Sequence, residues 1–293
     1  MRVLVLGATG MLGSSMINVF AQDDAHQVWG TVRGENSKRF LSKEIWSNLI
    51  TGVDVTDQDA LVRVLEAIRP DVVINCVGLI KQLAHAQDPL STLPINSMFP
   101  HRLAQLCGLM NARVVHISTD CVFSGRQGMY KETDLSDAQD LYGKSKFIGE
   151  LHERSNAITL RTSIIGHELN SNIAFVEWFL AQTGAVTGYS KAIFSGLPTV
   201  ELASVIKNYV IPNSQLSGLY HVAASPISKL DLLRLISVRY GKDIDIIPDD
   251  SVVIDRSLNG ERFQAATGYV ASAWPDLIDT MYKSNTVYTR RDL

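Results

Sequence analysis

Arg2-Val3-Leu4-Val5-Leu6-Gly7-Ala8-Thr9-Gly10-Met11-Leu12-Gly13 is the stretch that decides the fold. It is typical of a short, mostly apolar strand that enters a glycine-rich turn, and apolar residues at helical spacing follow it. In such a turn Gly7 permits the tight bend, Gly10 lets a pyrophosphate approach the backbone, and Gly13 allows the helix to pack closely on the strand. Free N–H groups at the helix start favour an anion. The stretch therefore predicts a dinucleotide site, although G-x-x-G-x-x-G departs from G-x-G-x-x-G, and a turn without a ligand is the alternative.

The end of the second expected strand bears on which dinucleotide is bound. About twenty residues past the turn, an NAD site usually carries an acidic residue that holds the ribose hydroxyls. Arg33 stands there instead, and its guanidinium suits a 2′-phosphate, so we expect NADPH as the cofactor. Glu35 lies close enough in sequence to keep NADH possible. A solvated surface arginine is the alternative.

Strand and helix patterns alternate along the chain in the way that builds a parallel sheet covered on both faces. We expect an α/β fold with a Rossmann-type, doubly wound parallel sheet and a smaller, mixed C-terminal substrate domain. Residues 1–166 would form the NADP-binding domain, completed by segments near 200–223, and residues 167–293 would mainly form the substrate domain. The expected strands lie near 2–6, 27–32, 49–53, 71–76, 112–118 and 157–161, with a late strand over 218–223 that rejoins the sheet. The expected helices lie near 11–22, 57–68, 96–110 and 141–154, followed by 171–182, 200–211 and 228–240.

Tyr142 and Lys146 are four residues apart in a stretch with a helical pattern, which places a phenol and an ammonium on one face. A cation held within a few ångströms of a phenol favours the phenolate and lowers its pKa toward working pH. The pair therefore predicts that Tyr142 donates a proton to a reacting group. The spacing alone also occurs on solvated helix faces, and it is the glycine turn at the start of the chain that favours the catalytic interpretation.

Three loops follow expected strands at their carboxyl ends, where open parallel sheets bind ligands. In the first, Asp54 could accept a hydrogen bond from an adenine amino group while Val55 packs against the ring; a helix cap is the alternative role of Asp54. The second loop has small residues that would let the backbone lie against a cofactor ribose, namely Cys76, Val77 and Gly78; a plain strand end is the alternative. In the third, Thr119 could hydrogen-bond a substrate carbonyl, unless its hydroxyl only caps a turn.

Bulk properties exclude several classes of protein. The 293 residues are 46% hydrophobic and 19% charged with a net charge of −3, so there is no basic excess of the kind that nucleic-acid binding needs. No apolar stretch is long enough to span a bilayer and the chain enters a strand without a leader, so we expect a cytoplasmic protein that contacts no membrane. Three scattered cysteines, and histidines without ligand spacing, predict reduced thiols and no metal site.

Four motifs together resemble one known family. They are Gly7-Ala8-Thr9-Gly10-Met11-Leu12-Gly13, Ser118-Thr119-Asp120-Cys121-Val122-Phe123-Ser124-Gly125, Tyr142-Gly143-Lys144-Ser145-Lys146 with Gly149-Glu150, and Leu160-Arg161-Thr162-Ser163. With these motifs in this order, the sequence resembles an extended short-chain dehydrogenase/reductase, and within that superfamily the dTDP-4-dehydrorhamnose reductase family of sugar-nucleotide reductases. Cys121 departs from the tyrosine usual at this place. Three further segments, residues 75–82, 166–169 and 193–199, resemble a branch whose members reduce UDP-linked 2-acetamido-2,6-dideoxy-4-hexuloses in bacterial surface-polysaccharide pathways.

The resemblance implies roles for named residues. It assigns catalysis to Thr119, Tyr142 and Lys146. Together with the turn and loops described above, the resemblance gives a cofactor site made of Gly7, Thr9, Gly10, Met11, Leu12, Gly13, Arg33, Asp54, Val55, Cys76, Val77, Gly78, Asn96, Ser118, Ser163, Tyr142 and Lys146. For the substrate it implies Lys81, Asp120, Cys121, His167, Glu168 and Arg256. Asn96 as a helix cap, Arg256 in a surface salt bridge, and Lys81, His167 and Glu168 as ordinary exposed residues are the alternatives.

The expected reaction is hydride transfer from NADPH to C4 of a nucleotide-linked 6-deoxy-4-ketohexose, in surface polysaccharide sugar biosynthesis. Tyr142 would protonate the nascent alkoxide, Lys146 would lower the tyrosine pKa and hold the nicotinamide ribose, and Thr119 would orient the carbonyl. The expected partner is a nucleotide-diphosphate sugar, and a homodimer is a possible assembly. Two other interpretations stay open: a nucleotide-sugar epimerase with tightly held NAD, and a non-catalytic dinucleotide-binding regulatory subunit. The residues also leave open the choice between UDP and dTDP sugars.

Overall fold

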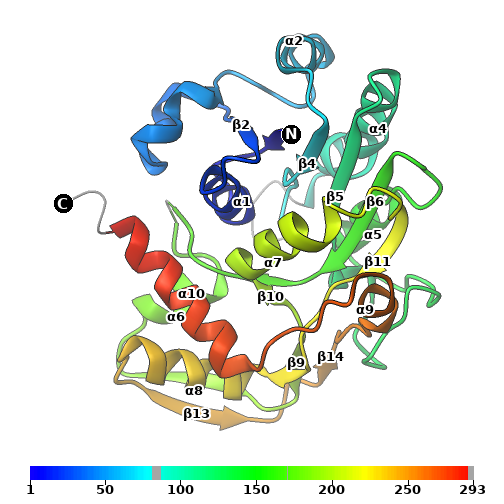
Figure 1. The fold of residues 1–293 in the computed structure, drawn as a ribbon. Helices are drawn as coiled ribbons and strands as arrows, with labels where there is room; N and C mark the ends of the chain where they lie inside the picture. Colours follow the sequence, from blue (N-terminus) through cyan, green and yellow to red (C-terminus); the bar gives the residue numbers. More distant parts are fainter. Residues whose placement is uncertain (81–86, 170, 290–293) are drawn as a thin grey trace.

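The computed structural model describes residues 1–80, 87–169 and 171–289 and has the expected α/β architecture (Figure 1). A seven-stranded parallel sheet forms its centre, in the order β11-β6-β5-β4-β1-β2-β3. The strands are β1 (Arg2–Leu6), β2 (Gln27–Thr31), β3 (Leu49–Ile50), β4 (Val72–Asn75), β5 (Arg113–Thr119), β6 (Ala157–Thr162) and β11 (Gly218–His221). The late strand thus rejoins the sheet beside β6, as the sequence predicts.

Along each central strand, alternate side chains point to opposite faces of the sheet, and each face is covered by its own apolar core. Both sets of side chains are therefore buried, which explains why these strands are almost continuously apolar. Val3 and Val5 belong to one core, and Leu4 and Leu6 belong to the other. Helices α1 and α7 contribute to the first core, and α2 and α4 to the second. The helices next to the sheet are α1 (Met11–Ala21), α2 (Gln58–Ile68), α3 (Pro89–Leu93), α4 (Phe99–Leu109), α5 (Leu141–Ile148) and α7 (Thr199–Val205).

The strand order turns back at β1, which has β4 on one side and β2 on the other. In open parallel sheets, ligands bind in the crevice outside the carboxyl ends of the strands at such a reversal. The loops that leave β1 and β4 are therefore neighbours, and the loop that leaves β5 is next along the same edge. These loops hold the glycine turn, residues 76–78 and Thr119.

The strands after residue 163 other than β11 form small separate sheets, and most of the later elements gather at the lower end of the molecule in Figure 1, around α8 and β13. Two small sheets pair β13 with β8, and β12 and β14 with β9, while β10 pairs with β7. The long helix α10 packs against both α7 and α8. The bounds are β7 (Ile164–Ile165), α6 (Phe175–Ala181), β8 (Ala185–Tyr189), β9 (Ala192–Phe194), β10 (Leu197–Pro198), β12 (Ile227–Ser228), α8 (Lys229–Tyr240), β13 (Asp245–Asp249), β14 (Ile254–Asp255), α9 (Glu261–Thr267) and α10 (Trp274–Thr289).

Several element boundaries differ from the expected ones. The helix expected over 141–154 ends at Ile148, because Gly149 follows and the chain turns back toward β6. The helix expected over 96–110 is a π-helical turn, η4 (Pro94–Met98), that leads into α4. A similar turn, η6 (Ile206–Val210), extends α7, and the 3-10 turns are η1 (Glu35–Phe40), η2 (Lys43–Asn48) and η5 (Asp120–Val122).

Two features are absent from the described residues. None of the helices within residues 1–80, 87–169 and 171–289 combines the length and the apolarity needed to cross a bilayer. The same residues contain no group of three or more His, Cys, Asp and Glu side chains arranged to hold a metal ion.

Candidate active site

The glycine turn between β1 and α1 forms an open backbone cradle. Gly7 has a φ of +80°, which favours glycine, and a Cβ at Gly13 would collide with the carbonyl oxygen of Gly7. The backbone N–H of Gly7 donates to Thr31 Oγ1 at 3.2 Å, which ties the turn to β2. No side chain caps the start of α1 at Gly10. The first N–H groups of this helix therefore suit the pyrophosphate of a dinucleotide, and the chemistry of the cradle fits that group.

Arg33 and Asp54 lie near each other at the β2 and β3 end of this crevice. Arg33 is exposed just after β2. The pKa of Asp54 is lowered mainly by hydrogen bonds from Thr56, whose backbone N–H lies at 2.8 Å and whose hydroxyl lies at 2.7 Å. The charge of Arg33 lowers the same pKa by a smaller amount. The cap of α2 is Asp57, not Asp54. Arg33 is thus accessible to a phosphate, and Glu35 nearby is engaged with Lys38.

The loop after β4 is held against α5 by Asn96. The side chain of Asn96 accepts a hydrogen bond from the N–H of Leu79 at 2.9 Å and donates to the carbonyl of the same residue at 3.0 Å. It also donates to Ser145 Oγ at 3.2 Å. An added Cβ on Gly78 would lie 3.9 Å from Lys146 Nζ, so Cys76, Val77 and Gly78 pass close to the ammonium. The structure therefore brings this loop, Asn96 and Lys146 together.

Thr119 and Tyr142 meet where β5 approaches α5. A hydrogen bond joins the Thr119 hydroxyl to Tyr142. The same hydroxyl accepts from the N–H of Cys121 at 3.1 Å and lies 3.1 Å from Asp120 Oδ1. The approach is close because Gly143 has no Cβ, which would collide with the carbonyl oxygen of Cys121. A substrate carbonyl near these hydroxyls would meet two hydrogen-bonding groups at once.

The pKa of Tyr142 differs from the one expected from its spacing to Lys146. Burial is the largest effect and raises the pKa of the phenol above its usual range, and the nearby Cys121, Asp120 and Asp140 raise it further. The hydrogen bond with Thr119 lowers this pKa but does not offset the effect of burial. The Lys146 ammonium instead donates to the carbonyl of Ile117 at 2.7 Å. The prediction of a lowered tyrosine pKa is therefore wrong for this structure, because spacing in sequence does not reveal how far a phenol is removed from water.

Lys146 itself is almost completely buried. Burial lowers the pKa of its ammonium to about 8, while Glu150 and Cys76 act to raise it. The side chain therefore carries its charge at neutral pH and loses it only as the pH rises past about 8.

The expected substrate residues lie in three places. Asp120 and Cys121 follow Thr119 directly, and Arg256 reaches the same loop because its Nε donates to the carbonyl of Phe123 at 2.8 Å. Both ring nitrogens of His167 are engaged, with Glu177 and, at 2.7 Å, with the hydroxyl of Tyr240. Glu168 accepts hydrogen bonds from Ser171 Oγ and from the N–H groups of Ile173 and Ala174, at the start of α6. Lys81 lies outside the described residues.

Ser118 and Ser163 also make contacts that the expected cofactor role did not include. Ser118 Oγ donates to Glu150 Oε1 at 2.6 Å inside the protein. The carbonyl of Ser163 accepts a hydrogen bond from the N–H of Leu197 at 2.9 Å. Glu150 and Arg161 are residues of the site region to which the sequence assigned no role. The sequence does indicate them, because an acidic residue and a basic residue stand within two of the four motifs.

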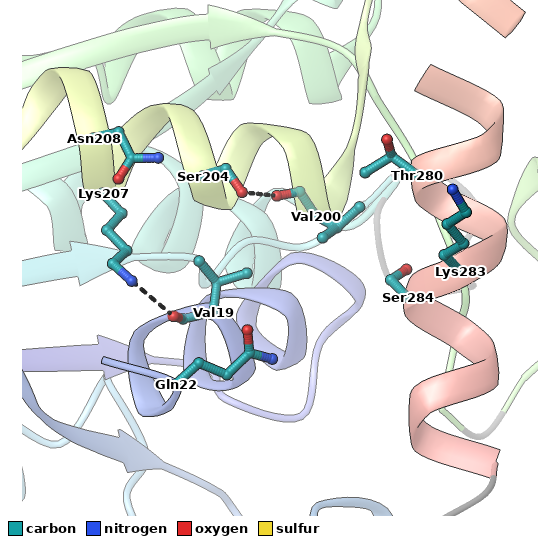
Figure 2. A pocket seen from close by; sticks show the side chains of 9 residues that line it. All are labelled: Val19, Gln22, Val200, Ser204, Lys207, Asn208, Thr280, Lys283 and Ser284. Atoms are coloured by element: carbon teal, nitrogen blue, oxygen red, sulfur yellow. Dashed lines mark hydrogen bonds between the residues drawn. The ribbon is translucent and has the colours of Figure 1, made fainter. Parts of the chain in front are cut away.

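A cavity at the far end of α1 lies away from this crevice. It has a volume of about 360 Å³ and opens between α1, α7 and α10. Figure 2 shows Val19 and Gln22 of α1 on one side and Thr280, Lys283 and Ser284 of α10 on the other. Val19 and Gln22 belong to the last turn and the C-terminal cap of α1, whereas the glycine turn is at its start. The cavity is therefore separate from the cradle.

Comparison with known proteins gives a consistent result. The sequence model of the family described as RmlD substrate binding domain matches residues 1–252. A protein named dTDP-4-dehydrorhamnose reductase from Aggregatibacter actinomycetemcomitans is 27% identical over 235 residues, which cover 77% of this chain and 74% of that protein. Methionine adenosyltransferase 2 subunit beta from Danio rerio is 29% identical over 236 residues, which cover 76% of this chain and 68% of that protein. The solved structure of dTDP-4-dehydrorhamnose reductase from Bacillus anthracis str. Ames in complex with NADP has a TM-score of 0.77 at 19% identity, covers 97% of this chain and 98% of that chain, and shows the shared fold.

Proposed function

The chain belongs to the family described as RmlD substrate binding domain, and from this premise we propose that it is an NADPH-dependent sugar-nucleotide reductase. The substrate would be a nucleotide-linked 6-deoxy-4-ketohexose, dTDP-4-dehydrorhamnose or a UDP-2-acetamido-2,6-dideoxy-4-hexulose, used for surface polysaccharide sugars. The observation that carries the proposal is that Thr119 meets Tyr142, while Lys146 on the same helix lies beside the loop that contains Gly78. The relative named dTDP-4-dehydrorhamnose reductase supports the same reaction class.

The cofactor would lie along the carboxyl edge of the sheet. The glycine turn, Gly7 to Gly13 with Thr9, Met11 and Leu12, would bind the pyrophosphate. Arg33 would pair with the 2′-phosphate, Asp54 and Val55 would contact the adenine, and residues 76–78 with Asn96 would lie along the ribose. When bound, NADPH supplies a hydride. NADH stays an alternative because only the charge of Arg33 favours the phosphorylated form.

The residues of this chain would manage the proton and the orientation of the substrate. Because its raised pKa keeps Tyr142 protonated at neutral pH, the phenol holds a proton ready for the stronger base that forms when the carbonyl is reduced. The Thr119 hydroxyl would orient that carbonyl. The buried ammonium of Lys146 would stabilise the phenolate left behind and hold the ribose. Asp120, Cys121 and Arg256 would contact the nucleotide sugar.

The decisive experiment incubates the protein with NADPH and a panel of dTDP- and UDP-linked 4-ketohexoses and follows the loss of NADPH absorbance. The wild type should oxidise NADPH with at least one sugar, and the Tyr142→Phe variant should bind NADPH normally but lose about a hundredfold or more in kcat. Tyr209→Phe, in the π-helical turn that extends α7, is a matched control and should keep full activity. Wild-type turnover in Tyr142→Phe would contradict the assignment.

Two alternatives have distinct outcomes in the same assay. An epimerase with tightly held NAD would convert the sugar without net NADPH oxidation. The second alternative is a non-catalytic regulatory subunit, and the similarity to methionine adenosyltransferase 2 subunit beta supports it. Such a subunit would bind the dinucleotide and leave every sugar unchanged. The division into a cofactor domain over 1–166 and a substrate domain over 167–293, and the homodimer, also stay proposals. Exposed apolar side chains on α3, η4 and α5, which pack together, support the homodimer; they are Leu90, Met98 and Ile148.

A further inference from the structure

A deeply buried ion pair lies next to the proposed catalytic residues. The side chains of Glu150 and Arg161 are 0% and 1% exposed. Arg161 Nε and Nη2 donate to the two carboxylate oxygens at 2.8 and 2.7 Å, which is a bidentate pairing. A pair in this position is not explained by stability alone, because well-packed apolar residues of similar volume often stabilise a protein as much or more.

The same carboxylate holds the strand that ends in Thr119. Ser118 Oγ donates to Glu150 Oε1 at 2.6 Å. Ser118 directly precedes Thr119, whose hydroxyl accepts from the N–H of Cys121 and hydrogen-bonds Tyr142. Glu150 itself comes two residues after the last residue of α5. One carboxylate thus connects the end of β5 to the end of the helix that carries Tyr142 and Lys146.

Glu150 also interacts electrostatically with Lys146, four residues before it. Burial lowers the pKa of Lys146, and the charge of Glu150 is the largest effect that opposes this. The other titratable groups that interact with the ammonium are Cys76, from the loop after β4, and His116, from β5.

Glu150 is ionised at neutral pH despite its burial. Burial acts to raise the pKa of the carboxyl group, but the hydrogen bonds from Arg161 and His152, the charge of Arg161 and the hydrogen bond from Ser118 leave that pKa below its usual value. The arrangement is anchored in β11, because Arg161 Nη1 lies 3.4 Å from His221 Nε2.

We propose that Glu150 is a positioning residue for the reduction. Its carboxylate holds Ser118, and with it the Thr119 turn, against the end of α5, and it places a negative charge near the Lys146 ammonium. The inference rests on the proposed function, which gives Thr119 and Lys146 a common reaction. It gives a role in positioning to a buried ion pair that stability alone does not explain.

The variants are chosen so that the protein can still fold. Glu150→Gln alone leaves Arg161 as an unpaired buried charge, so the informative variant is Glu150→Gln with Arg161→Met, which removes both charges and keeps the volume. Ser118→Ala removes only the link to β5. Thr159→Val is the matched control, since Thr159 lies on the same strand as Arg161, is buried, and hydrogen-bonds the N–H of Leu151 without any charge.

Two measurements separate a positioning role from a merely structural one. The pKa of Lys146 is measured by NMR on isotope-labelled lysine in the protein without nucleotide, with Lys146→Arg to assign the signal. We expect a lower Lys146 pKa in the double variant, and an unchanged one in Thr159→Val. In the NADPH assay, the double variant should lose about tenfold in kcat, and the pH above which kcat falls should move down, while KM for the sugar stays nearly constant. Ser118→Ala should lower kcat without moving the Lys146 pKa.

Each outcome decides the inference. A folded double variant with the wild-type Lys146 pKa would overturn it, as would equal kcat losses in the double variant and in Thr159→Val. If the wild type oxidises no NADPH with any sugar in the panel, the proposed function fails, and the NMR titration alone then decides whether Glu150 sets the charge on Lys146.

Discussion

The chemistry of the Tyr142 and Lys146 pair depends on burial more than on spacing. The sequence predicts correctly that the two residues lie on one helix. Because they are four residues apart, about one turn, their side chains leave the helix on the same face. It does not predict that burial raises the pKa of the phenol and lowers that of the ammonium to about 8. Desolvation depends on strands and loops far away in sequence, so the pattern could identify these residues but could not give the direction of the tyrosine shift.

Arg33 offers a test of cofactor preference at the level of one side chain. Replacing it by alanine should raise KM for NADPH about tenfold and leave KM for NADH unchanged, because only the 2′-phosphate needs the guanidinium. Steady-state kinetics with both cofactors measure the difference. Arg63→Ala, also exposed but on α2, is the control and should change neither value. Equal losses with both cofactors would contradict the proposed contact.

At the scale of elements, the central sheet and the late helices α6, α7 and α8 follow closely from the sequence, whereas the short C-terminal strands do not. Apolar strands such as β1 and β4 are buried on both faces, and this gives a strong and local signal. The pairings of β8 with β13 and of β9 with β14 join short segments about 60 residues apart. Buried residues such as Val186 and Phe194 stand among exposed or partly buried ones, so neither the apolar pattern nor the length of these segments distinguishes them from loops.

The close contact between the glycine turn and α1 predicts what adding a methyl group at Gly13 would do to stability and to cofactor binding. Gly13→Ala would push a Cβ into the carbonyl oxygen of Gly7, so we expect a loss of about 1–3 kcal/mol in the free energy of unfolding and much weaker NADPH binding. Chemical denaturation and a fluorescence titration with NADPH measure the two effects.

Gly108→Ala is the matched control for that substitution. Gly108 lies inside α4, where the nearest atom to an added Cβ, Asn156 Nδ2, is 3.4 Å away. Alanine is the better helix former, so this variant should be as stable as the wild type or slightly more stable. If Gly13→Ala behaves in the same way, the turn is not as tightly packed as the structure indicates.

At the scale of the whole molecule, a C-terminal segment packs against the chain that follows β5. Ser257 hydrogen-bonds the backbone of Met129 and Tyr130, and Asp255 donates its N–H to the carbonyl of Gly125. Arg256 lies between these contacts and reaches Phe123. The resemblance of the motif to known reductases pointed to Arg256, but no local pattern could predict its contact across more than 120 residues.

Arg256 provides the test at this scale. If its guanidinium binds the diphosphate of the substrate, Arg256→Ala should raise KM for the nucleotide sugar about tenfold and change kcat much less. Initial rates over a range of sugar concentrations give both values. Arg234→Ala removes an exposed arginine of α8 that pairs with Asp231, and it should leave the kinetics unchanged. A fall in kcat alone would mean that Arg256 supports the Thr119 loop instead of the substrate.

The place of β11 in the sheet has a consequence for how this polypeptide is made. Its residues 218–221 cover the outer edge of β6, and the carbonyls of Val210 and Leu216 just before it accept hydrogen bonds from Arg113 at the start of β5. A chain that ends at residue 166 lacks β11, and the backbone edge of β6 is then open to other molecules. We expect such a truncated product to associate with itself or with chaperones, because cofactor-binding architecture matures only after some fifty further residues have been synthesised.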